Sequence, residues 1–313
     1  MKEYVLNYYK EFKCIAGKCK HTCCAGWEMN IDEQSLIKYK GENSAFSAIL
    51  NKGINFKKSK FKSDKSGRCA FLNDKGLCEI IIHLGENSLC QVCRDHPRFR
   101  SFFSDRIEMG LGFCCEQATR IILSYENKIQ PKLIADDKKE EELDFNQRNI
   151  LAFREKALDI VQDRAVNIND RVENLLKLCK AEVLESDFPK ILKTFYKFER
   201  LDKEWTKRLN DIKNKPFKTA VDNKFSLICE QFLVNGIYRL LSVAEDTMWV
   251  RAITIGNVIA WWVIQNIIID NQSVDGINFE LIVDVVRAYS SEVEYSEKNL
   301  DRLFSFAYNF IKI

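Results

Sequence analysis

The sequence has few of the features that mark nucleotide-binding, hydrolytic or nucleic-acid-binding proteins. It contains only four prolines and three histidines among 313 residues. No Gly-x-Gly-x-x-Gly loop and no P-loop is present to hold a dinucleotide or a nucleotide phosphate. No arrangement of serine, histidine and acid suggests acyl transfer. The net charge of +3 is too small to imply a polyanionic partner, so we expect no nucleic acid partner.

A secretion signal is also lacking, because polar sequence and no apolar segment follows Met1. We therefore expect a cytoplasmic protein with reduced thiols. One stretch, residues 252–269, carries no charge over 18 residues, which is close to the length of about 20 apolar residues that a membrane span needs. It contains Asn257, Gln265 and Asn266, whose amides are costly in a bilayer. We expect a buried core helix and no membrane span.

Cysteine is abundant in this chain and unevenly placed. Ten of the twelve cysteines lie in the first 115 residues. Cys14, Cys19, Cys23 and Cys24 fall within eleven residues, and two native disulfides are hard to form there because adjacent cysteines point apart. The same four sulfurs are easily arranged as soft ligands around one metal centre or two. The other N-terminal thiols are Cys69, Cys78, Cys90, Cys93, Cys114 and Cys115.

The spacing of the cysteines suits a metal site without identifying the metal. Pairs two to four residues apart, such as Cys19–Cys23 and Cys90–Cys93, converge through a turn. Structural zinc takes four ligands as two neighbouring pairs, whereas an iron–sulfur cluster takes four cysteines with looser spacing. His21 and His96 are possible nitrogen ligands, or side chains with a hydrogen-bonded or solvent-facing role. The residues alone leave these alternatives open.

Hydrophobic periodicity divides the chain into two parts. Alternating apolar residues over 27–31 and 107–113 predict short strands, and residues 69–78 predict a hairpin. Asp32 is expected to cap a helix that ends near Gly41. Beyond the charged residues 136–142, apolar residues recur every three or four positions, which predicts helices almost throughout. Cys179 and Cys229 lie on such apolar faces, so we expect buried apolar residues and not ligands.

We therefore predict a mainly α protein with two domains. Residues 1–125 are expected to form an N-terminal Cys-rich α+β metal-binding domain. Residues 126–313 are expected to form an α-helical domain.

The cysteines belong to a longer pattern that a known family shares. Its parts are Phe12-x-Cys14-x₄-Cys19-x₃-Cys23-Cys24-x-Gly26-Trp27-x₃-Ile31-Asp32, Cys69-x-Phe71-Leu72 to Leu77-Cys78, Cys93-x₂-His96-Pro97-Arg98 and Cys114-x-Glu116. This pattern resembles the flagellin lysine-N-methylases of the FliB type, which belong with wider cysteine-cluster proteins regarded as zinc or iron chelators. The resemblance is specific over residues 12–120 and weaker over 225–265, where Glu230–Arg239 resembles a helical segment of the methylases.

The resemblance implies methyl transfer from S-adenosylmethionine to lysine ε-amines of flagellin, with a [4Fe–4S] cluster bound by cysteines. Zinc is the alternative metal. Cys90 has no firm counterpart, and Cys115 stands where the pattern has proline, so which thiols are ligands stays open. The thiols that match the pattern are Cys14, Cys19, Cys23, Cys24, Cys69, Cys78, Cys93 and Cys114.

Lysine methylation sets a requirement for the site. The nucleophile is the neutral amine, but free lysine has a pKa of about 10.4, so the site must desolvate the amine or remove its proton. Trp27, Asp32 and Glu116 match the family pattern and are our candidates for catalysis. Their alternative roles are a core residue, a helix cap and a partner of a metal ligand.

The helical part supplies a second group of candidates. Glu230, Asn235, Tyr238 and Arg239 place polar groups on an otherwise apolar helix, and we expect them to line the site of the acceptor lysine or to form a surface face. The rival function is a non-enzymatic zinc- or iron-chelating module that binds a protein partner.

Overall fold

The structure is a computed structural model that describes residues 1–138, 142–219, 223–271 and 278–312. The chain forms two compact units, one made of residues 13–98 and the other of residues 1–12 together with 99–313. These bounds differ from the expected division near residue 125.

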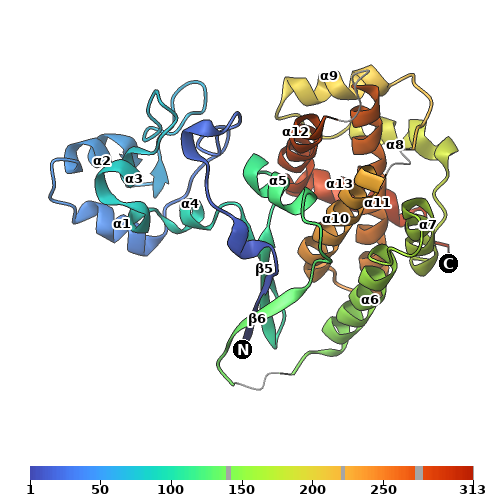
Figure 1. Cartoon of the computed structure of the whole chain (residues 1–313). Helices are drawn as coiled ribbons and strands as arrows, with labels where there is room; N and C mark the ends of the chain where they lie inside the picture. Colours follow the sequence, from blue (N-terminus) through green and yellow to red (C-terminus); the bar gives the residue numbers. More distant parts are fainter. Residues whose placement is uncertain (139–141, 220–222, 272–277, 313) are drawn as a thin grey trace. The chain divides into compact units, whose positions relative to one another are not determined.

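The unit of residues 13–98 is small and combines short helices with short strands (Figure 1). An aromatic core that includes Tyr39, Phe46, Phe61 and Phe71 holds it together. Its elements are α1 (Glu33–Lys40), α2 (Ser47–Gly53), β2 (Ile54–Asn55), β3 (Lys60–Phe61), α3 (Glu79–Leu84) and α4 (Gln91–Asp95).

The sequence predicts only part of the local structure of this unit. Asp32 caps α1, because its Oδ1 accepts a hydrogen bond from the backbone N–H of Ser35 at 2.9 Å. The expected turn of the hairpin forms where Leu72 pairs with Cys78. The expected strand over 27–31 is wrong. Only isolated bridges form nearby, and Gly26, with a φ of 88°, turns the chain just before it.

The second unit begins with a four-stranded sheet. Its strands are β1 (Lys2–Leu6), β4 (Arg98–Phe102), β5 (Arg106–Leu111) and β6 (Pro131–Asp136), in the order β4-β5-β1-β6. β1 runs parallel to β5 and antiparallel to β6. The strand expected near 107–113 is confirmed, and the helix α5 (Glu116–Leu123) follows it. Residues 99–125 belong with the helices because β5 pairs with the N-terminal strand and α5 contacts the helical core.

Helices make up the rest of this unit, so the expected mainly α fold is confirmed. Buried residues of nearly every helix join one large hydrophobic core. The helices are α6 (Phe145–Val161), α7 (Ile168–Leu178), α8 (Phe188–Phe195), α9 (Lys203–Ile212), α10 (Asn223–Leu240), α11 (Thr247–Asp270), α12 (Phe279–Tyr289) and α13 (Glu297–Tyr308).

α11 is the central helix of the unit and contacts α6, α9, α10, α12 and α13 (Figure 1). Its N-terminus is fixed by Asp246, which accepts hydrogen bonds from the N–H groups of Met248 and Trp249, each at 2.8 Å. In the part of the chain that the structure describes, α11 alone has the length and hydropathy of a membrane span. Because 89% of its most apolar window is buried by the protein itself, its apolar character is explained by packing, as expected.

α10 and α11 approach each other closely at a glycine. A Cβ atom on Gly236 of α10 would lie 2.5 Å from Oδ1 of Asn257 on α11, a distance that packed atoms do not adopt. This close contact positions two of the helices that line the cavity described below.

Candidate functional site

Five cysteines share the core of residues 13–98. Cys69 and Cys90 are buried members of that core, and Cys24, Cys78 and Cys93 pack against it. All five are free thiols. The backbone N–H of Cys69 donates to the carbonyl of Cys24 at 2.8 Å. Cys78 closes the hairpin and precedes α3, and Cys90 precedes α4, which carries Cys93.

The protonation of these thiols depends on burial and on short-range hydrogen bonds. Burial, together with neighbouring thiols such as Cys24, raises the pKa of Cys69 to about 12. Burial also raises the pKa of Cys78. A hydrogen bond from the thiol of Cys93 lowers the pKa of Cys90. Cys24 has its pKa lowered to about 7, chiefly by a hydrogen bond with Cys23.

Backbone N–H groups also point at three of the sulfurs. Cys69 accepts from Phe71, Cys78 accepts from Ile80 and Ile81, and Cys90 accepts from Cys93. Hydrogen bonds of this kind stabilise thiolates and orient metal ligands. The donor chemistry therefore fits a metal bound by thiolates.

The ligand geometry is not preformed. Among the residues that the structure describes, no three His, Cys, Asp or Glu side chains are arranged to hold a metal ion. The sulfurs share one core without forming a ready metal site. Cys90, which had no counterpart in the sequence pattern, lies in the same core as Cys24, Cys69, Cys78 and Cys93.

The remaining predicted ligands lie elsewhere. Cys14 and Cys23 are exposed and Cys19 is partly buried in the same unit. Cys114 belongs to the other unit, where burial raises its pKa to about 12. Neither unit therefore holds all eight thiols that match the family pattern. The ligand assignment stays a prediction.

The two N-terminal histidines differ in environment. His21 is exposed. His96 is partly buried, and burial together with Arg98 lowers its pKa to about 4, so its imidazole is neutral at pH 7. The His96 ring stacks on the indole of Trp27 with 6.3 Å between ring centroids.

The three candidate catalytic residues have distinct surroundings. Trp27 is 39% exposed, and its Nε1 donates to the carbonyl of Cys23 at 2.7 Å. Asp32 uses both carboxylate oxygens as backbone acceptors, because its Oδ2 also accepts from the N–H of Gln91 at 2.7 Å. Glu116 is the first residue of α5 in the other unit, buried and 3.5 Å from Arg120. Their catalytic roles stay predictions.

Replacing Asp32 with alanine is expected to lower the free energy of unfolding by about 1–2 kcal/mol. The variant loses the cap of α1 and the bond to Gln91. Although burial acts to raise it, backbone N–H groups from Gln91 and Ser35 lower the pKa of Asp32. Its contribution is therefore present above the unfolded pKa of about 3.9 and is lost as pH falls through the lower folded value. Denaturant unfolding at several pH values measures it, and equal stabilities at pH 7 would contradict it.

The polar residues of α10 have internal partners. Glu230 binds Arg164 and Arg171, each at 2.7 Å. Asn235 accepts a hydrogen bond from the Tyr8 hydroxyl and donates one to the carbonyl of Leu111 at 3.2 Å.

The last turn of α10 continues this pattern. The Arg154 guanidinium lies 5.0 Å from the centre of the Tyr238 ring. Arg239 forms an ion pair with Glu294. These polar groups therefore tie α10 to its own unit. Glu230, Asn235 and Tyr238 are buried, so the expected surface face is wrong, and their place in a site for the acceptor lysine stays a prediction.

Cys179 and Cys229 are buried in the helical unit, as expected. Burial raises the pKa of both thiols, to about 12 for Cys179. Replacing both by alanine is expected to leave metal content unchanged, at a cost of about 1 kcal/mol for each site. Metal analysis of the purified double variant tests this, and a fall in metal content would show that the helices supply ligands.

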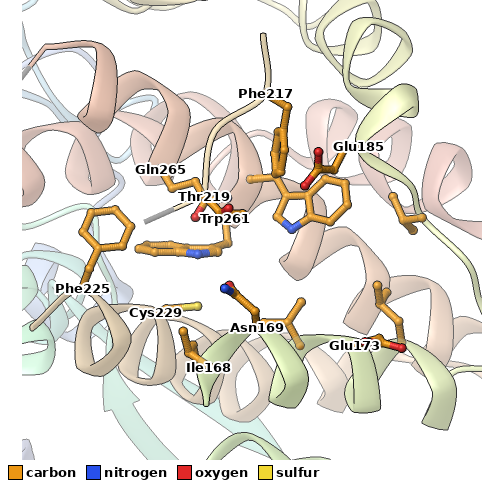
Figure 2. A pocket seen from close by; sticks show the side chains of 14 residues that line it. Ile168, Asn169, Glu173, Glu185, Phe217, Thr219, Phe225, Cys229, Trp261 and Gln265 are labelled. Atoms are coloured by element: carbon orange, nitrogen blue, oxygen red, sulfur yellow. The ribbon is translucent and has the colours of Figure 1, made fainter. Parts of the chain in front are cut away.

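One feature of the helical unit had no sequence signal beyond the pair Trp261-Trp262. A cavity of about 230 Å³ lies between α7, α10 and α11 (Figure 2). Aromatic side chains from α10, α11 and the segment before α10 line it together with polar side chains from α7 and α11.

Comparison with known proteins places the chain in a family. The sequence model for the FliB lysine N-methylase C-terminal domain matches residues 109–309. The chain is 26% identical to the flagellar biosynthetic protein FliU of Salmonella muenchen over 135 residues, which cover 40% of this chain and 80% of that protein. It is 25% identical to a lysine-N-methylase of Salmonella typhimurium over 40% of this chain and 34% of the methylase.

The lysine-N-methylase of Salmonella choleraesuis gives a similar match, with 26% identity over the same shares of each chain. The aligned region thus spans about a third of the length of the two methylases. No solved structure matches the chain significantly. Because the family model covers more than half of the sequence, the chain belongs to the FliB-type lysine N-methylase family.

Proposed function

We propose that this protein methylates lysine ε-amines of flagellin, with S-adenosylmethionine as the methyl donor. The observation that carries the proposal is the match of residues 109–309 to the FliB family. The names of the Salmonella relatives support lysine as the acceptor and a flagellar protein as the substrate. The match spans only part of the two methylases, so their whole activity enters here as a proposal.

The reaction itself constrains the site. The neutral amine of lysine attacks the methyl carbon of the sulfonium, so that a C–N bond forms while the C–S bond breaks and its electrons stay on sulfur. The amine then releases a proton to a base or to water. Because lysine is protonated at pH 7, the site must favour its neutral form before transfer.

A metal centre is the second part of the proposal. Cys24, Cys69, Cys78, Cys90 and Cys93 would supply its ligands, because they share one core in residues 13–98. Four of them suffice for a [4Fe–4S] cluster or for zinc. When bound, an iron–sulfur cluster would supply one-electron chemistry and zinc would supply folding free energy. The protein's part is to bury the thiols and to orient them with backbone N–H groups.

Anaerobic purification tests both parts. Iron, sulfide and zinc are measured, and the loaded protein is incubated with flagellin and S-adenosylmethionine labelled at its methyl group. We expect label on lysines of flagellin and none on flagellin whose lysines have been acetylated. A fully loaded protein that transfers no label would contradict the methylase proposal. If the protein that transfers no label contains zinc and no iron, the rival function, a metal-chelating module that binds a protein partner, would be favoured.

A further inference from the structure

The cavity between α7, α10 and α11 has a deep aromatic part. Trp261 is 2% exposed and Trp262 is 9% exposed, and both line the cavity. Ring packing fixes them, because the Trp261 centroid lies 5.2 Å from that of Phe225 and the Trp262 centroid lies 4.8 Å from that of Phe217. Figure 2 shows Trp261, Phe217 and Asn169 around a common space. Aromatic faces held in this way attract cations, most strongly when water is excluded.

A buried amide adds a polar group to the cavity. Gln265 lines it and is 4% exposed. The side chain of its neighbour Asn266 bonds to the backbone of Lys218 and of Trp262. The Gln265 carbonyl oxygen is a hydrogen-bond acceptor, so it can bind a ligand that donates an N–H group.

The rim of the cavity is acidic. Glu173 and Glu185 line it and are exposed. Glu173 also lies 2.7 Å from Lys177, but both side chains are more than 60% exposed, so water and salt weaken that pair. The cavity therefore has an apolar and aromatic base, one buried amide and two carboxylates at its mouth.

The size of the cavity limits the ligand. Its volume of about 230 Å³ is below the range of roughly 300–1,000 Å³ that pockets for drug-sized ligands occupy. A nucleoside-sized methyl donor is therefore too large to be enclosed. A linear aliphatic chain that ends in a cation fits both the volume and the lining.

We propose that this cavity binds the alkylammonium end of a lysine side chain presented by a protein, in its unmethylated or methylated form. The choice of lysine as the carrier of the cation rests on the proposed function. The rings contact the chain and the ammonium group, Gln265 accepts an N–H bond from it, and the two carboxylates attract it at the mouth.

Calorimetric titration with three small amides tests the inference without methyl donor or flagellin. N-acetyl-lysine methylamide and its trimethyl-lysine form carry the cation, and the norleucine compound has a similar chain without charge. We expect both cations to bind at least about tenfold more tightly than norleucine. Comparable affinity for norleucine, or no saturable binding of either cation, would overturn the proposal.

Two variants identify the groups involved. Glu173→Gln with Glu185→Gln should weaken both cations several-fold, whereas the exposed Glu245→Gln control, outside the cavity, should not. Gln265→Leu should weaken the lysine amide but spare the trimethyl form, which has no N–H to donate. Circular dichroism checks that the variants fold. Unchanged affinities across these variants would place binding elsewhere.

The outcomes separate this inference from the proposed function. If the protein binds the cations through these residues and yet transfers no methyl group, that result would contradict only the methylase proposal. The triple variant combines Gln265→Leu, Glu173→Gln and Glu185→Gln. Methyl transfer to flagellin by this variant with the wild-type KM would contradict only the cavity proposal.

Discussion

Serine in place of Cys69 is expected to remove bound metal and to unfold residues 13–98. Cys69 is 7% exposed and shares its core with four other cysteines. Metal binding supplies folding free energy in domains of this kind, on the order of 10 kcal/mol for a structural zinc site. A small unit has little hydrophobic core to replace that contribution. Metal analysis and thermal unfolding of the whole chain measure the two effects.

The matched control is Cys179→Ser, a change to a buried thiol in the other unit. It should keep the metal while lowering stability only locally. Cys90→Ser extends the test to a cysteine that the family pattern did not include. The five cysteines that share the core of residues 13–98 would not be the metal site if the Cys69→Ser protein kept the wild-type metal content and the wild-type Tm.

Local signals in the sequence predicted local structure well. Asp32 and Gly41 bound α1 because a cap and a chain reversal depend on neighbouring residues. The apolar periodicity beyond residue 142 likewise predicted helices. The N-terminal strand was not predicted, because β1 exists only through pairing with β5, about a hundred residues later, and with β6. Such long-range pairing leaves no pattern within β1 itself.

The positions of the cysteines also depend on long-range contacts that the sequence does not show. Spacing grouped Cys14, Cys19, Cys23 and Cys24, but only Cys24 of these packs against the core with Cys69 and Cys90. A loop can hold cysteines close in sequence while the fold directs them to different environments. The family pattern does not include Cys90, and its burial depends on contacts with distant residues.

The role of the polar residues of α10 is also not predictable from the sequence, for a physical reason. A charged residue on an apolar helix signals either a site or a buried ion pair, and the sequence does not show the partner. Arg171, the partner of Glu230, is 59 residues away. The sequence does not predict the cavity, because its lining comes from three helices and the segments between them and its aromatic residues resemble ordinary core.

Replacing Glu230 with alanine is expected to lower the free energy of unfolding of the helical unit by about 3–5 kcal/mol. Glu230 is 1% exposed, and Arg171, whose side chain is 7% exposed, would lose its charge partner. Arg164, at 40% exposure, can turn to water, so most of the cost comes from Arg171. For a unit of this size, each kcal/mol lowers Tm by about 2–4 °C, and thermal unfolding should show a fall on the order of 10 °C.

Two further variants test whether the unpaired charge of Arg171 causes this loss of stability. Glu182→Ala removes a carboxylate whose pair with Lys312 is exposed on both sides, and it should change the free energy of unfolding by no more than about 0.5 kcal/mol. Adding Arg171→Leu to Glu230→Ala should restore part of the lost stability, because no unpaired charge then remains buried. A double variant less stable than Glu230→Ala alone would mean that Arg171 stabilises the unit through its hydrogen bond to the Val161 carbonyl and not through its pairing with Glu230.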